Sequence, residues 1–116
     1  TAPAFGFNDT GASWLPQPPE FAAFARDVER GAKESTLSLY TAALTLRAEF
    51  ALGTGTLEWI DQYGSDVVAF RNGDIEVITN FGQAPVELGD KVVLLSSEPG
   101  IDGSVPTDVT VWVRDV

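Results

Sequence analysis

Carboxylates are the most numerous side chains in this sequence that could do acid–base chemistry. The chain has 17 Asp and Glu residues against 7 Lys and Arg residues, and it has no His and no Cys. The commonest general base is therefore missing, and neither a Ser-His-Asp triad nor a Cys-His pair can form within the chain. With so many carboxylates, almost any acid–base pair can be drawn on paper, so a pairing alone is not evidence.

The positions of the Asp residues favour a structural role. Asp commonly bonds its own backbone at turns, and six Asp residues lie at predicted strand ends and turns. The interval from Asp61 to Asp66 lacks the oxygen ligands and distal Glu of a calcium-binding EF-hand loop. Gly53 and Gly55 precede a strand and not a helix, which excludes a phosphate loop. We expect no catalytic residue, no metal site and no cofactor. The six residues are Asp61, Asp66, Asp74, Asp90, Asp102 and Asp108.

Aromatic side chains are the remaining candidates for binding. Sugars stack their C–H faces on aromatic rings, so Trp59, Tyr63 or Trp112 could serve a carbohydrate site. The alternative is that Trp59 and Trp112 close a β core or cover its edge. Residue chemistry alone favours this alternative.

The charge of the chain excludes some classes of partner. The formal net charge is −10, which repels a nucleic-acid backbone and an anionic membrane surface. No stretch approaches the ~20 apolar residues that span a bilayer, and nothing resembles a signal peptide. We expect neither nucleic acid nor a membrane as a partner. Because the chain has no Met and begins at Thr1, we also expect it to be a piece of a longer protein.

The first third of the chain has little regular pattern. Residues 1–20 hold four of the seven Pro residues and three aromatic residues, Phe5, Phe7 and Trp14. A flexible linker would expose these rings at a cost, so we favour an ordered loop on an apolar surface. Residues 19–31 predict a short helix, which begins at a Pro pair and ends at Gly31.

A longer helix is predicted over residues 35–50. Ser35 or Thr36 can accept a hydrogen bond from the first turn. Two apolar stripes follow at helical spacing, which is more than a surface helix needs. We expect one stripe to be poorly buried in this chain unless the N-terminal segment covers it. The stripes are Leu37, Tyr40, Leu44 and Ala48, and Leu39, Ala43, Leu46 and Phe50.

From Leu57 the hydrophobic period changes to two. Asn72-Gly73 predicts a two-residue type I′ turn, in which both central residues have a positive φ. Short strands at even spacing predict an antiparallel Greek-key β-sandwich or partial barrel. The fold class is therefore mainly β with one long helix and an irregular, Pro-rich start. The six predicted strands are 57–60, 66–71, 74–79, 85–88, 91–96 and 108–114.

The order of several short motifs resembles a known enzyme family. In sequence they are Phe5-Gly6-Phe7, Trp14-Leu15-Pro16, Ser35-Thr36-Leu37, Leu57-Glu58-Trp59, Val68-Ala69-Phe70-Arg71, Thr79-Asn80-Phe81, Val93-Leu94-Leu95 and Pro106 to Arg114. Together they are similar to the C-terminal end of glycoside hydrolase family 13 alpha-glucosidases of the oligo-1,6-glucosidase-like branch. The similarity is weakest over residues 19–34, where the family shows a Val-Glu-x-Gln stretch and an Asp-Pro-Asp-Ser turn that this chain lacks.

This resemblance implies that the chain spans parts of two domains of a longer protein. Residues 1–54 would end a (β/α)₈ catalytic barrel, with 35–50 as its last helix, and residues 55–116 would form a C-terminal all-β domain. The whole enzyme would be cytoplasmic and would hydrolyse terminal alpha-linked glucose of short oligosaccharides with retention. Its catalytic carboxylates would lie on upstream barrel strands, so none is assigned here. The implied partners are that barrel and, through it, the oligosaccharide. Phe7 and Trp14 could border the sugar pocket or only pack the loop.

Two other functions stay open on the sequence. The chain could be a stand-alone carbohydrate-binding β-sandwich that uses Trp59 or Trp112. It could also be a non-catalytic interaction module that docks through the helix and the aromatic loop.

Overall fold

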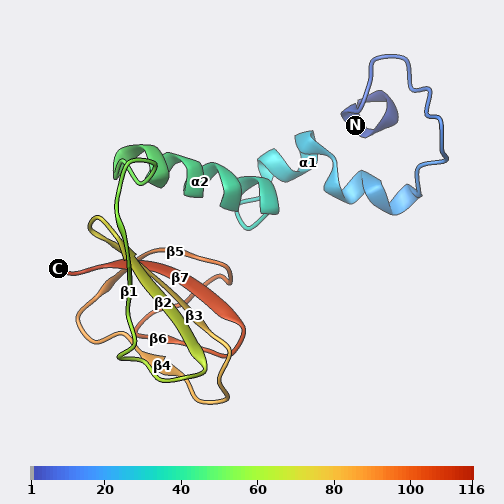
Figure 1. Cartoon of the computed structure of the whole chain (residues 1–116). Coiled ribbons are helices and arrows are strands. Elements are labelled where there is room, and N and C mark those ends of the chain that lie inside the picture. Colours follow the sequence, from blue (N-terminus) through green and yellow to red (C-terminus); the bar gives the residue numbers. More distant parts are fainter. Residues whose placement is uncertain (1) are drawn as a thin grey trace. The chain divides into compact units, whose positions relative to one another are not determined.

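The computed structural model describes residues 2–116 as two compact units (Figure 1). One unit ends at Thr41 and the other comprises Ala42–Val116. The division falls inside helix α2 (Thr36–Glu49), whereas the sequence analysis placed a domain boundary at residues 54 and 55. That predicted boundary stays a prediction, and the two units are described separately.

The N-terminal unit contains short helical segments. A 3₁₀ turn, Pro3–Gly6, includes Ala4 and Phe5 at φ 47° and 53°, a conformation that side chains disfavour. A second 3₁₀ segment, Pro19–Phe24, is followed by α1 (Arg26–Gly31). The single helix predicted over 19–31 is therefore wrong, because the backbone at Ala25 is extended, with ψ at 138°. Its predicted end at Gly31 is confirmed.

Helix α2 begins as predicted at a Ser cap. The Ser35 hydroxyl accepts a hydrogen bond from the Ser38 N–H at 3.1 Å and donates one to the Glu29 carbonyl at 2.6 Å. One apolar stripe is poorly buried, as expected: Tyr40 is 64% and Leu44 62% exposed. The stripe from Leu39 to Phe50 is half-buried.

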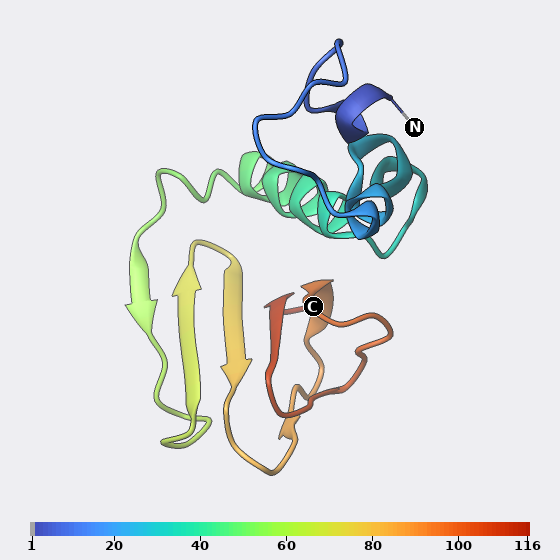
Figure 2. The ribbon, with the colours of Figure 1, turned by 90° about the vertical axis from the view of Figure 1, so that its right-hand side faces the viewer.

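The C-terminal unit is mostly antiparallel β-sheet (Figures 1 and 2). Five strands form one sheet in the order β1-β2-β3-β7-β5, and two short strands, β4 and β6, form another. All six strands predicted from the sequence are present, and β6, of two residues, was not predicted. The strands are β1 (Leu57–Trp59), β2 (Val67–Asn72), β3 (Ile75–Asn80), β4 (Val86–Glu87), β5 (Val92–Ser96), β6 (Ser104–Val105) and β7 (Val109–Arg114).

The strand register separates a core face from an outer face. Ala69, Ile78 and Val111 lie side by side in the register and are buried. Leu88 and Val105, from the region of the small sheet, pack against the same cluster. Alternate residues point to the opposite face, so the large sheet buries one side in a sandwich and leaves the other more open.

The hairpin between β2 and β3 is confirmed, but its turn type is not. Asn72 pairs with Ile75, so the central turn residues are Gly73 and Asp74. Gly73 has a φ of 59° and Asp74 has no positive φ, a pattern typical of type II′ and not of type I′. Asn72 stays in the strand because its side-chain amide donates to the Leu52 carbonyl at 3.1 Å.

Candidate functional site

A buried carboxylate, Glu76, is the centre of the largest polar cluster that we find in the C-terminal unit. Its side chain is 2% exposed and accepts three hydrogen bonds. The donors are the Tyr63 hydroxyl, the Lys91 ammonium at 3.0 Å and the Arg71 guanidinium at 3.3 Å. Lys91 also donates to Asp115 at 2.6 Å. The cluster thereby joins β2, β3 and the ends of β5 and β7.

These contacts hold the cluster in its charged form. Burial alone would raise the pKa of Glu76, but hydrogen bonds from Tyr63, Lys91 and Arg71 outweigh it and keep that pKa below its ordinary value. Burial likewise opposes charge on Lys91, yet Asp115 and Glu76 raise the pKa of its ammonium. Burial and the bond to Glu76 raise the pKa of the Tyr63 hydroxyl. Glu76 is therefore a fixed anion that accepts protons poorly.

The sequence analysis missed this cluster. A signal was present, because the alternation of β3 places Glu76 on the same face as the buried Ile78. A charged residue at an inward position requires partners. Arg71 supplies one partner from directly across the β2–β3 hairpin, five positions away. Lys91, 15 positions away, supplies another and is found only once the strands pair.

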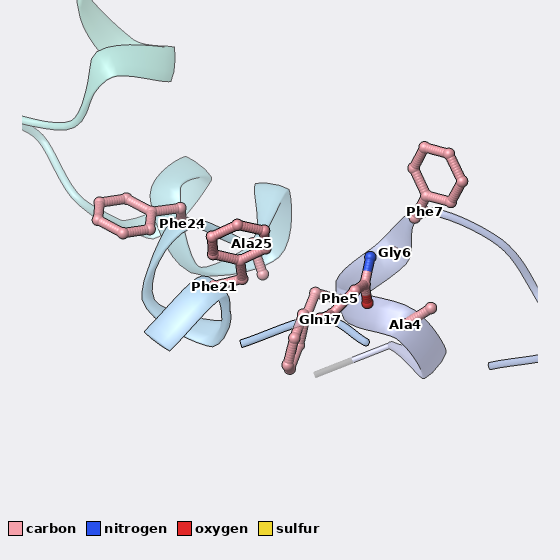
Figure 3. Close-up of a pocket in the computed structure, with 8 residues that line it drawn as sticks. All are labelled: Ala4, Phe5, Gly6, Phe7, Gln17, Phe21, Phe24 and Ala25. Carbon is pink, nitrogen blue, oxygen red and sulfur yellow. The ribbon is translucent and has the colours of Figure 1, made fainter. Parts of the chain in front are cut away.

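An apolar hollow of about 400 Å³ lies in the N-terminal unit (Figure 3). Phe7, a candidate substrate contact, lines it and is 82% exposed. The second candidate, Trp14, is 98% exposed and is not among the lining residues, so the structure does not bring the two together. The rings of Phe21 and Phe24 occupy the opposite end of the hollow from Phe7. The hollow offers stacking surfaces but few polar groups.

The outer face of the large sheet carries the aromatic residues singled out from the sequence. Phe70, Val77 and Trp112 follow one another in the register, and Trp59 pairs with Phe70. The Trp59 and Phe70 rings meet edge to face, with centroids 5.9 Å apart. Trp59 is 69% exposed on an edge strand. The expectation was that the two Trp residues close the core or cover its edge. Neither belongs to the core cluster, so they do not close the core, but Trp59 does lie at the edge of the sheet. The core face of β7 is instead filled by Val109, Val111 and Val113.

Tyr63, the third aromatic candidate, has a different role from the two Trp residues. It packs against the core cluster and bonds Glu76, so its hydroxyl is engaged within the fold. Of the Asp residues assigned to turns, Asp108 has a left-handed φ of 60° beside β7. Across residues 2–116 no group of three or more carboxylates is placed to hold a metal ion. No helix in that range is long and apolar enough to cross a membrane.

Comparison with known proteins identifies the fold. No protein-family model matches the chain, and no curated protein matches it. Among solved structures, the crystal structure of alpha-amylase from H.orenii matches with a TM-score of 0.55 and 22% sequence identity. The alignment covers 90% of this chain and 25% of that one. The chain thus shares its fold with about a quarter of an alpha-amylase.

Proposed function

We propose that this chain is the C-terminal part of a glycoside hydrolase family 13 enzyme and is itself catalytically silent. The single observation that carries the proposal is the fold shared with an alpha-amylase over 90% of this chain. The order of the short motifs from Phe5 to Arg114, which resembles that of the family, also supports it.

The chemistry of the described residues supports a silent segment. A retaining glycosidase needs a carboxylate nucleophile and a carboxylic acid that can donate its proton. A general acid requires a raised pKa, whereas the pKa of Glu76, the one buried acidic residue of residues 2–116, is lowered. Its oxygens are also occupied by three donors. In the family that this chain resembles, the nucleophile and the acid lie on barrel strands, and we place them upstream of this chain.

Within that family, we infer an alpha-glucosidase that removes terminal alpha-linked glucose and works in the cytoplasm. The order and spacing of the short motifs from Phe5 to Arg114, taken together, resemble this branch. In the full enzyme the segment that holds Phe7 and Trp14 would follow a barrel strand at the face where barrel active sites lie. Exposure of Phe7 and Trp14 leaves both rings free to contact a barrel or a sugar.

The upstream coding sequence tests this proposal. We expect it to encode a (β/α)₈ barrel whose strands carry the Asp and Glu residues, with an Arg-x-Pro-x-Pro-Trp-like motif directly before Thr1. An upstream sequence without a barrel pattern would reject the family assignment.

A carbohydrate-binding β-sandwich is the second candidate, favoured by the exposure of Trp59 beside Phe70. It requires maltose or isomaltose to change the fluorescence of Trp59 or Trp112. No fluorescence change with either sugar would reject it. If the fluorescence does change, the same titration of Trp59→Phe shows whether Trp59 is the responding ring.

A further inference from the structure

A second, polar hollow lies in the C-terminal unit where α2 ends beside the β2–β3 hairpin. Its volume is about 250 Å³, and its walls are Phe50, Arg71, Gly73, Asp74, Arg114 and Asp115. The sequence did not suggest a binding site formed by these residues. Of the six, only Arg71 and Asp115 take part in the Glu76 cluster. The hollow therefore offers groups that the described contacts do not occupy.

The segment that follows Phe50 contacts the β2–β3 hairpin. Asn72 at the end of β2 donates to the Leu52 carbonyl at 3.1 Å. A Cβ at Gly55 would lie 1.8 Å from the Asn72 side-chain oxygen, so the connection to β1 passes directly against Asn72. These contacts hold the segment after Phe50 against the hairpin that supplies Gly73 and Asp74.

The chemistry of the walls defines the class of ligand. Arg114 and Asp74 are exposed, and within residues 2–116 neither forms an ion pair or a side-chain hydrogen bond. Arg114 presents several N–H donors and Asp74 presents acceptors only. Two Arg and two Asp residues balance the charge of the hollow, so an ion of either sign meets repulsion as well as attraction. A neutral ligand whose hydroxyl groups both donate and accept satisfies both side chains.

We propose that this hollow binds one glucose unit of an α-linked oligosaccharide, apart from any catalytic centre. Arg114 donates to neighbouring sugar hydroxyls, Asp74 accepts from them, and Phe50 offers its ring to the C–H face of the sugar. The choice of α-linked glucose rests on the proposed function, whereas the match to a neutral polyol rests on the walls alone. Such a site would hold a substrate chain on the β unit.

The test is a titration of the full 116-residue chain with maltotriose, followed by amide chemical shifts. We expect Gly73, Asp74 and Asp115 to shift together. Arg114→Gln and Asp74→Asn should each weaken the apparent affinity about tenfold or more, because each removes a charge-assisted hydrogen bond. Arg26→Gln and Asp90→Asn are matched controls outside the hollow and should leave the affinity unchanged. Unaltered shift dispersion in each variant confirms that it is folded.

Three results would overturn the proposal. One is the absence of any shift with saturating maltotriose. Another is a response centred on Trp59 and Trp112 and insensitive to Arg114→Gln, which would move sugar binding to the outer face of the sheet. The third is binding of glycine without binding of maltotriose, which would identify a site for a zwitterion. Failure of the proposed function would be seen separately, as an upstream sequence without a barrel, and would leave the titration result standing.

Discussion

The buried carboxylate of Glu76 provides the sharpest test of how the β unit is held together. The substitution Glu76→Gln keeps the size of the side chain and removes its charge. Glu76 is 2% exposed, so the loss cannot be compensated by water. Lys91, which is 16% exposed, would keep only Asp115 as its partner. We expect a substantial loss of stability with the fold retained.

The structure sets the size of the expected effect. Breaking a buried ion pair by removing one partner costs about 3–5 kcal/mol. The Arg71 pair contributes less than about 1 kcal/mol of this, because Arg71 is 46% exposed and screened by solvent. Lys91 retains one partner and Gln can still accept from Tyr63, so the lower end applies. The prediction is a loss of about 3 kcal/mol, which is large against the roughly 5–15 kcal/mol stability of a typical domain.

Urea unfolding measures this loss directly, with the fluorescence of Trp112 and Trp59 reporting on the large sheet. The matched control is Glu87→Gln on the exposed side of β4, which should change the free energy of unfolding by no more than about 0.5 kcal/mol. A loss below about 1 kcal/mol for Glu76→Gln, or an equal loss for both variants, would refute the reasoning.

Three further predictions follow from described contacts. The folded-state pKa of Glu76 lies below its ordinary value of 4.5, so the stability that ionised Glu76 contributes is complete above pH 4.5 and is lost as the pH falls through the folded-state pKa. Between pH 7 and pH 3 the urea midpoint should therefore fall less steeply in Glu76→Gln than in the unmodified chain. Parallel slopes would contradict this. Gly55→Ala should lower the free energy of unfolding by roughly 1–3 kcal/mol, because the new Cβ would meet the Asn72 side chain. In a double-mutant cycle, Asn72→Ala should relieve part of that loss. Strict additivity of the two substitutions would show that the side chains do not clash. Asn80→Ala should lower the free energy of unfolding by roughly 2–4 kcal/mol, because this fully buried amide donates to the Ala84 and Val105 carbonyls and accepts from the Gly82 N–H. Thermal unfolding measures the loss, and an unchanged Tm would mean that these bonds contribute nothing.

Much of the fold follows from local pattern. Alternation predicts the strands because one face of the large sheet is buried, as Val109, Val111 and Val113 show for β7. The cap at Ser35 follows from short-range hydrogen bonding, and the end of α1 at Gly31 follows from the low helix propensity of glycine. The break at Ala25 does not, because its neighbours are good helix formers and only the extended backbone there marks it.

The polar features depend on contacts between distant segments, which explains why the sequence did not reveal them. The turn at Gly73 and Asp74 is shifted by one residue because Asn72 bonds Leu52, 20 positions earlier. Likewise, the partners of Glu76 come from Tyr63 and Lys91, 13 and 15 positions away. Residue type alone identified the aromatic candidates. Their exposure depends on the strand register, which places Trp112 on the outer face of the sheet, away from the core.

Hydrolysis of a nitrophenyl α-glucoside tests the central claim most directly. The assay compares the 116-residue chain with the longer protein that includes its upstream sequence. We expect turnover by the longer protein and none by the 116-residue chain, because we place the nucleophile and the acid in the upstream part. Turnover by the 116-residue chain alone, or none by the longer protein, would contradict it.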